Sequence, residues 1–147
     1  MDTTFWLALG SFVFSFYTYR KTLVHERKRA TLDAYNKLQH QSLDHLNHYT
    51  PSQIKDIAED VRSEEYKKLS AYIARVEHFC VGVNQKIYDA HTVYELSHGY
   101  LDGALKYKIQ PILDKKVVNG KDYYANIKNV LFKMELETKR REQKKKG

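Results

Sequence analysis

The side chains that most often carry chemistry are spread along this chain without forming a catalytic motif. Seven histidines are present, and three of them cluster at His40, His45 and His48. Zinc-binding histidines on one helix stand three or four residues apart, and only His45 and His48 meet that spacing. Because this pair also lies near an expected helix end, we interpret the three as surface or capping histidines. We predict neither a metal site nor a cofactor.

The other reactive groups also favour structural roles. The single cysteine, Cys80, falls on an apolar seam, so we expect a buried thiol rather than a nucleophile. The acidic pair Glu64–Glu65 stands beside lysines on a solvated helix face, where nothing would raise a carboxyl pKa for acid–base work. No glycine-rich phosphate loop occurs in the sequence. The sequence therefore predicts a protein that is not an enzyme.

A ligand groove is the binding site that the polar residues favour most. The chain has twelve tyrosines, and a buried tyrosine needs a partner for its hydroxyl group. If the folded part binds a small anion such as a nucleotide, the candidate residues are His91, Tyr94, His98 and Tyr100. Gly99 and Gly103 lie one turn apart in this region, and we expect them to allow close helix contact rather than approach of a ligand.

These groups must be positioned by helices, and the first helix is the most distinctive. Residues 3–19 carry no charged side chain, and Arg20 and Lys21 follow at once. At about 1.5 Å per residue this stretch forms roughly 25 Å of helix, near the lower limit for crossing a bilayer. Aromatic residues at both ends fit the interfacial belts of membrane helices. We expect a transmembrane helix over residues 1–24; a cleaved signal peptide, a buried core helix and an interfacial helix are the alternatives.

The positive charge is concentrated at two places. Residues 20–29 hold five Lys or Arg and one Glu, and residues 139–146 hold six and one, whereas the net charge of the chain is only +7. The rest of the chain is therefore slightly acidic, which disfavours nucleic acid as a partner. For the tail, the alternatives are a solvated helix end, contact with anionic lipid, and contact with nucleic acid.

The first basic run predicts the orientation in the membrane. Basic flanks stay in the cytoplasm, so we expect a single-pass protein of the cell (inner or plasma) membrane with its N-terminus outside and its C-terminus in the cytoplasm. The side chains that we expect to act as cytoplasmic charge anchors are Arg20, Lys21, Arg27, Lys28 and Arg29.

The expected span carries a stripe of hydroxyl groups. At about 100° per residue, five side chains fall within about 40° of a common direction. They are Thr4, Ser11, Ser15, Thr18 and Thr22. The stripe is either a packing face between helices, the lining of a hydrophilic pore, or without a role. Because one span cannot enclose a pore, the first two interpretations make the stripe the face between subunits of a homo-oligomer.

The rest of the chain has the pattern of a helical bundle. Apolar residues recur every three or four positions, most clearly from Tyr66 to Ile87. Thr50, Ser63, Asp89 and Asp122 are expected to cap helices. We predict a helical first segment that runs to about His48, a turn at Asn119–Gly120, and a kink or helix end at Pro111.

The predicted fold class is all-α. An N-terminal transmembrane helix over residues 1–24 continues into a juxtamembrane helical stalk over 25–49. A compact cytoplasmic antiparallel helical bundle over residues 50–138 follows, and a basic C-terminal tail occupies 139–147. About 100 residues in three or four helices suffice for one core.

Two stretches carry a resemblance to a known family. They are RKRATLDAYNKLQ at residues 27–39 and YIARVEHFCVGVNQKIYDAHTVYELSHGYLDGALKYKIQPIL at residues 72–113. The chain resembles, over most of residues 5–134, a family of small bacterial membrane-anchored proteins catalogued as a domain of unknown function. The resemblance implies one N-terminal membrane helix and a cytoplasmic α-helical domain, and it brings no catalytic residues. Proteins of this general build also occur beside nucleotide-signalling antiviral genes, which implies a membrane effector of bacterial defence.

The expected function follows from the membrane helix and the bundle. We expect a non-enzymatic oligomeric membrane protein whose bundle senses a signal or assembles the spans, as a channel-like or membrane-disrupting effector would. Its partners are then the lipid bilayer, further copies of the chain, and either a small nucleotide signal or a cytoplasmic protein. The alternative is a passive anchor or scaffold that recruits a cytoplasmic partner protein.

Overall fold

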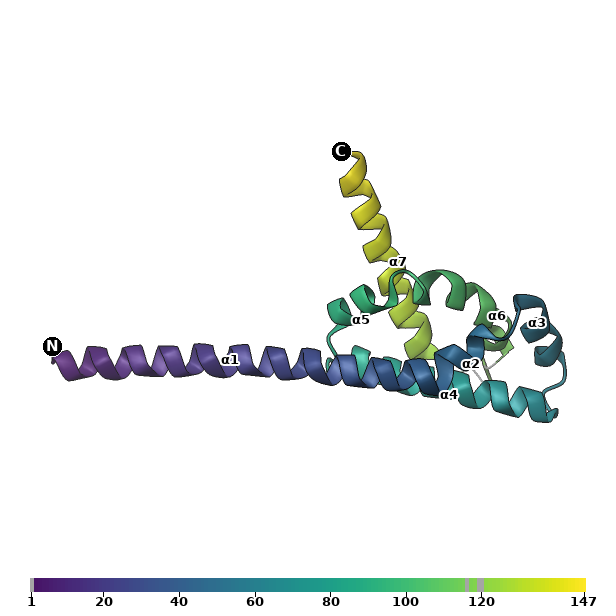
Figure 1. Ribbon diagram of the computed structural model, residues 1–147, viewed down its shortest axis with the longest axis horizontal. Coiled ribbons are helices and arrows are strands. Elements are labelled where there is room, and N and C mark those ends of the chain that lie inside the picture. Colours follow the sequence, from purple (N-terminus) through teal and green to yellow (C-terminus); the bar gives the residue numbers. More distant parts are fainter. Residues whose placement is uncertain (1, 116, 119–120) are drawn as a thin grey trace.

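The computed structural model describes residues 2–115, 117–118 and 121–147, almost all of them in helices (Figure 1). The expected all-helical architecture is confirmed. The helices are α1 (Thr3–Leu38), the π-helical segment η1 (Gln39–Leu43), α2 (Asp44–Asn47), α3 (Pro51–Glu59), α4 (Glu64–Asn84), α5 (Ala90–Ser97), the π-helical segment η2 (Leu101–Leu105), α6 (Lys106–Lys115) and α7 (Ala125–Lys146). One short antiparallel hairpin pairs β1 (Val117–Val118) with β2 (Lys121–Asp122). The turn expected at Asn119–Gly120 lies outside the described residues.

Helix α1 has two halves with opposite surroundings. Residues 3–26 are all exposed, and Figure 1 shows this half extending far beyond the rest of the molecule. From Thr31 onward one face is buried, and the helical path continues through η1 and α2, where Leu43 and Leu46 are fully buried. The segment 25–49, which we expected as a stalk, therefore contributes to the core of the bundle.

The exposed half of α1 does not meet the requirements for a membrane span by itself. Among the described residues, no helix combines the length and the apolarity that crossing a membrane demands. The transmembrane helix expected over residues 1–24 is thus not supported. Its uncharged stretch is interrupted by hydroxyl-bearing side chains and is followed directly by Arg20 and Lys21, which lowers the mean hydropathy of the segment.

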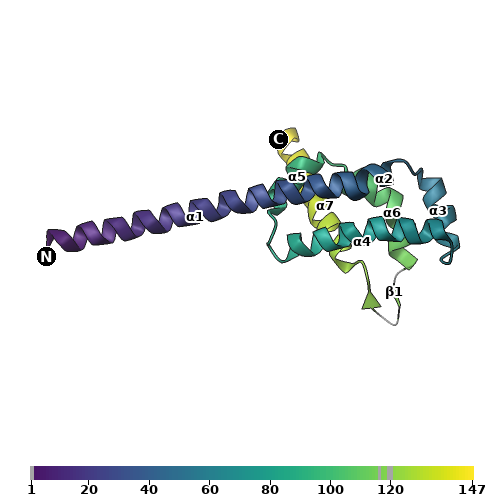
Figure 2. The same ribbon diagram turned by 60° about the horizontal axis from the view of Figure 1, so that its bottom comes forward.

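The second half of α1 packs antiparallel to α4 (Figure 2). The rings of Tyr35 and Phe79 meet edge to face with centroids 6.0 Å apart. One turn earlier on α4, the guanidinium of Arg75 donates a hydrogen bond to the carbonyl of Gln41 in η1 (3.0 Å). This pairing sets the direction in which α1 leaves the bundle.

Three helix starts follow the capping rules. The backbone N–H of Gln53 donates to the Thr50 hydroxyl (3.2 Å), and the Gln53 side chain accepts from the Thr50 N–H (2.8 Å), which completes a capping box. Ser63 accepts from the N–H of Tyr66 at the start of α4 (3.1 Å), and Asp89 caps α5. These predicted caps are confirmed.

The apolar seam of α4 is buried as expected up to Val83, but the helix ends one residue later, at Asn84. The seam was predicted to include Ile87, and that residue is instead 56% exposed in the turn before α5. The turn folds back over Gly82, where an added Cβ would lie 2.5 Å from the ring of Tyr88. A side chain at Gly82 would therefore prevent the turn from closing.

The region from α5 to α6 is interrupted by a turn at His98 and Gly99 and does not form one continuous helix. His98 and Gly99 adopt left-handed backbone conformations (φ 48° and 78°), and they end α5. Tyr107 is 74% exposed, and an added Cβ at Gly99 or Gly103 would meet nothing within 4 Å. The expected close helix contact at Gly99 and Gly103 is therefore wrong. Pro111 lies inside α6.

Helix α7 begins with a cap from another helix. We expected Asp122 as the cap, but Asp122 instead accepts from the N–H of Tyr124 (2.9 Å) and pairs with Lys128. Both carboxylate oxygens of Glu77, on α4, accept hydrogen bonds at the start of α7: from the backbone N–H of Ile127 (2.8 Å) and from the backbone and side chain of Asn126. The expected basic tail 139–147 is the continuation of α7.

Removing the Glu77 cap tests how strongly α4 holds α7. Hydrogen bonds to a charged acceptor contribute about 1.5–3 kcal/mol, so Glu77→Ala should lower the free energy of unfolding by about 2–3 kcal/mol. Glu77→Gln, which keeps one acceptor oxygen, should cost less. The measurement is urea unfolding followed by circular dichroism. Glu59→Ala, at the exposed end of α3, is the control and should stay within about 0.5 kcal/mol of the parent chain. Equal effects at the two sites would contradict the capping role.

Candidate functional site

A hollow between α5 and α7 is the best-formed candidate site. Its volume is about 250 Å³. Buried apolar side chains from α4 and α7 form its floor, and polar side chains stand around its rim. The lining residues are Val83, Ala90, His91, Tyr94, Val130, Lys133, Met134 and Glu137.

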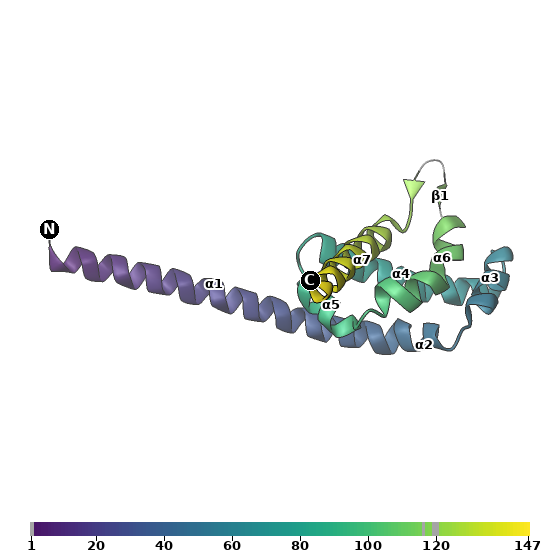
Figure 3. The same ribbon diagram turned by 90° about the horizontal axis from the view of Figure 1, so that it is seen from above.

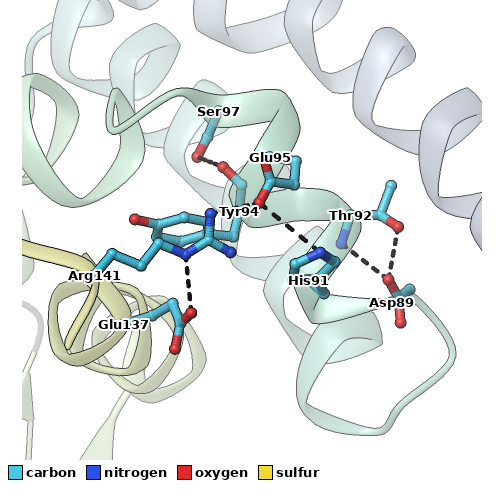
Figure 4. A network of polar contacts seen from close by, with 8 residues as sticks. All are labelled: Asp89, His91, Thr92, Tyr94, Glu95, Ser97, Glu137 and Arg141. Carbon is cyan, nitrogen blue, oxygen red and sulfur yellow. Dashed lines mark hydrogen bonds and ion pairs between the residues drawn. The ribbon is translucent and has the colours of Figure 1, made fainter. Parts of the chain in front are cut away.

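Arg141 joins the two helices at the edge of this hollow (Figure 4). Its guanidinium pairs with Glu95 on α5 (2.6 Å) and with Glu137 on α7 (3.0 Å). The same group lies over the ring of Tyr94, 4.3 Å from the ring centroid, which is close enough for a cation–π contact. Arg141 therefore connects α5 to the last turns of α7.

A second chain of polar contacts starts at the Tyr94 hydroxyl. It lies 3.1 Å from the hydroxyl of Thr138, which donates to the carboxylate of Asp102 on η2 (2.9 Å). Tyr94 thus has its ring under Arg141 and its hydroxyl tied toward η2. This arrangement fixes the wall of the hollow in one position.

The carboxyl groups around α7 have lowered pKa values. Hydrogen bonds from Arg141 lower the pKa of Glu95 and of Glu137, and nearby positive charges add to both shifts. Hydrogen bonds from Lys106 and Lys139 lower the pKa of Glu135 to about 2. These groups are ionised at neutral pH, so they act as acceptors rather than as proton donors.

The structure brings together only two of the four residues predicted for a ligand groove. His91 and Tyr94 line the hollow, and His91 stands 3.8 Å from Glu95. His98 lies in the left-handed turn that ends α5. The hydroxyl of Tyr100 donates to the side chain of Asn47, and burial raises the pKa of this tyrosine. Neither His98 nor Tyr100 lines the hollow.

Sequence reasoning missed the α7 side of the hollow. Lys133, Glu137 and Arg141 were not predicted as site residues, although the spacing of Glu137 and Arg141 is that of an ion pair on one helix. A second hollow, of about 420 Å³ between α1 and α4, was also missed. It has Lys37, Arg75 and His78 among its lining residues.

The predicted stripe and charge anchors lie mostly on the exposed half of α1. All five hydroxyl residues are exposed, and Thr22 donates its hydroxyl to the carbonyl of Thr18 (2.9 Å). Arg20 lies over the ring of Phe16, 5.3 Å from its centroid. Arg27 differs from the other charge anchors because it donates to the carbonyl of Tyr88 (3.2 Å) and so belongs to the bundle.

The histidine cluster has local partners. His45 stacks on Tyr72 with centroids 4.8 Å apart, and His48 lies 2.7 Å from the carbonyl of Asp44. Within the part of the chain that the structure describes, no group of three or more His, Cys, Asp or Glu side chains is placed to hold a metal ion. Burial raises the pKa of the Cys80 thiol.

These features define a class of protein: a helical bundle with a long, exposed, aromatic-rich N-terminal helix. The family described as Domain of unknown function (DUF4760) matches residues 5–134, so the chain belongs to that family. No curated protein and no solved structure matches this chain.

Replacing Arg141 tests whether it holds α7 against α5. Arg141→Gln removes two exposed ion pairs and the contact with Tyr94, so amides of residues 137–146 should exchange hydrogen roughly threefold to tenfold faster. Arg140→Gln, at the adjacent exposed position, is the matched control. An unchanged exchange rate in Arg141→Gln would show that α7 is held by its apolar face alone.

Acid should weaken the contact between η2–α6 and α7. A carboxyl group with a lowered pKa stabilises the fold above its ordinary pKa, which is 4.5 for Glu135, and loses that contribution as pH falls toward about 2. We expect stability to decline between these values, and less steeply in Glu135→Gln. Urea unfolding at pH 6, 4 and 2.5 measures this. Identical pH dependence in the two proteins would contradict the role of Glu135.

Proposed function

We propose that the protein is a non-enzymatic, oligomeric membrane protein, attached through the exposed half of α1, with the bundle in the cytoplasm. The observation that carries the proposal is the exposure of large apolar side chains on residues 5–19. Leu7 and Phe14 are each 71% exposed, and Phe12 is 69% exposed. Soluble monomers rarely expose contiguous apolar patches larger than a few hundred Å². These side chains surround the helix, so a covering on one side would leave others in water.

Self-association would complete the apolar surface that one helix lacks. The stripe of Thr4, Ser11, Ser15 and Thr18 is the most polar face of residues 3–19. When copies meet along this stripe, the hydroxyl groups are withdrawn from lipid and the phenylalanines face outward. Gly10 adds a small residue to this segment, and an added Cβ there would meet nothing within 4 Å. A helix too polar to cross a bilayer alone can then do so in an oligomer.

The basic run supports the orientation. Arg20 and Lys21 follow the apolar segment directly, and Lys28 and Arg29 come about two turns later; all four are exposed. Positive charge beside a span favours the cytoplasmic side, so the N-terminus lies outside and the bundle inside. The bundle then either receives a signal, such as a small nucleotide or a cytoplasmic protein, or assembles the spans. A role as a channel-like effector of bacterial antiviral defence rests on the resemblance described above.

The second candidate is a passive anchor that recruits a cytoplasmic partner protein. The hollow between α5 and α7 favours it, because its apolar floor and polar rim are typical of binding sites. The two candidates differ in their need for self-association: a pore requires several copies and a tether requires one.

Bulky side chains on the stripe should disrupt the oligomer. We expect Ser11→Leu combined with Ser15→Leu to lower the oligomer mass of the full chain in mild detergent, measured by light scattering, and to abolish ion flux from reconstituted liposomes. Phe12→Leu combined with Phe14→Leu, on other faces of the helix, is the control and should leave both unchanged.

Three outcomes separate the alternatives. A parent chain that is monomeric in detergent and conducts nothing supports the passive anchor. An oligomer without flux supports a packed interface rather than a pore. A parent chain that does not float with liposomes in a density gradient contradicts membrane attachment altogether.

A further inference from the structure

Three elements meet at the end of the bundle from which α1 emerges. Because α1 and α4 are antiparallel, the turn between α4 and α5 lies beside the point where α1 leaves the core. Arg27 donates to the carbonyl of Tyr88 (3.2 Å), and the N–H of Asp89 donates to the hydroxyl of Thr31 (2.8 Å). The turn over residues 85–89 is therefore fixed beside residues 27–31 of α1.

The C-terminal end of α7 reaches the same end of the molecule. Figures 1 and 3 show α7 running across the bundle and finishing above α5, on the side from which α1 extends. Arg141 holds this part of α7 to Glu95 on α5 (2.6 Å), so its direction is fixed by a contact. Residues 144–146 extend beyond that contact as the last turn of the helix.

The charges at this end are mostly positive. We call the set the basic end, and it consists of the exposed residues Lys28, Arg29, Lys86, Arg140, Lys144, Lys145 and Lys146. The nearby acidic groups are Glu26, Asp89, Glu95, Glu137 and Glu142, and Arg141 pairs with two of them, Glu95 and Glu137. Ile87, beside Lys86, is 56% exposed and adds an apolar side chain to the same edge. A surface of this composition would be attracted to a negatively charged surface.

The length of α1 places the basic end close to such a layer. From Arg20, where the uncharged segment ends, to Arg27, where the helix joins the bundle, the rise is about 10 Å. The Debye length at 0.1 M salt is also about 10 Å, so charges at the level of Arg27 act on a surface beginning at Arg20.

We propose that the basic end is a second membrane contact, in which the last turn of α7 binds the headgroups of anionic lipids. This contact rests on the proposed attachment through α1 and goes beyond it, because it fixes the orientation of the bundle relative to the bilayer. The α1 helix supplies insertion, which does not depend on lipid charge. The basic end supplies a contact that depends on both lipid charge and salt.

The test uses the full chain with a fluorescent label at its C-terminus. Gly147→Cys provides a thiol for an environment-sensitive dye, while Cys80 stays unlabelled because it is 2% exposed and burial raises the pKa of its thiol. The labelled chain is reconstituted into vesicles of neutral phosphatidylcholine alone or with 30% phosphatidylglycerol. We expect energy transfer to a headgroup acceptor dye to be high only in the anionic vesicles and to fall in 0.5 M NaCl.

Two triple variants isolate the tail lysines. Replacing Lys144, Lys145 and Lys146 with Gln should shift the equilibrium between bound and unbound tail by roughly a hundredfold, at about a factor of five for each basic residue near an anionic surface. Replacing Lys55, Lys67 and Lys68 with Gln removes the same charge from α3 and the start of α4. These elements lie at the opposite end of the bundle, and the change should leave the energy transfer intact (Figure 1).

The outcomes distinguish this contact from the membrane attachment on which it rests. A chain that floats with both kinds of vesicle but shows equally low energy transfer in both overturns the tail contact alone. Equal loss of transfer in the two triple variants also overturns it, because net charge rather than the basic end would then be responsible. A chain that floats with neither kind of vesicle overturns the attachment and the tail contact together.

Discussion

The hydrogen bonds that the Glu77 carboxylate accepts from the start of α7 are the constraint on which the rest of the arrangement depends. Helix α7 has no side-chain cap of its own, since its N-cap residue is Tyr124. A carboxylate at a helix N-terminus satisfies orphan N–H groups and interacts favourably with the helix dipole. Because Glu77 lies on α4, its hydrogen bonds fix the start of α7 relative to α4, and α4 also packs against the second half of α1. Together with the Arg141–Glu95 ion pair (2.6 Å), this junction fixes the hollow beside α5 and the position of the basic C-terminal end.

Helix α1 changes environment within one turn, and Arg27 lies at the change. On one side, Thr31 and Tyr35 are buried against the bundle. On the other side, every residue from 3 to 26 is exposed, although many of them are large and apolar. Arg27 has a backbone acceptor at Tyr88 and so ends the packed region. The bundle does not cover the first half of α1, and this is the surface on which the proposed membrane attachment and self-association depend.

Local signals in the sequence located three of the four predicted helix caps, and only the cap at Asp122 was wrong. The caps at Thr50, Ser63 and Asp89 each depend on a side chain and the N–H group three residues further on, and all three are present. Periodicity also located the buried face of α4.

What the sequence could not supply was contact between distant elements. The cap of α7 by Glu77 joins positions about fifty residues apart, and no local pattern marks it. The break at His98 was missed because a left-handed conformation at a residue other than glycine has no strong signature. After that break, only His91 and Tyr94 of the four residues predicted for a ligand groove line the hollow. Arg141 was missed as a site residue because its partner Glu95 lies on another helix, far away in the sequence.

The dimensions of α1 favour the first of the two proposed functions. Residues 3–19 form about 25 Å of helix, whereas the hydrocarbon core of a bilayer is about 30 Å thick. Side chains on a helix point toward its N-terminus, and Arg20 does so by lying over Phe16. In the proposed orientation Arg20 therefore points back toward the lipid rather than away from it. A single copy would have to thin the bilayer around itself and expose its hydroxyl stripe to lipid. When several copies associate, they share the thinned region and cover their stripes against each other. Association therefore lowers, for each copy, the free-energy cost of thinning the bilayer and of exposing the stripe to lipid. A passive tether has no use for a segment that is short and carries a hydroxyl stripe, whereas an oligomeric protein can use both features to drive its association.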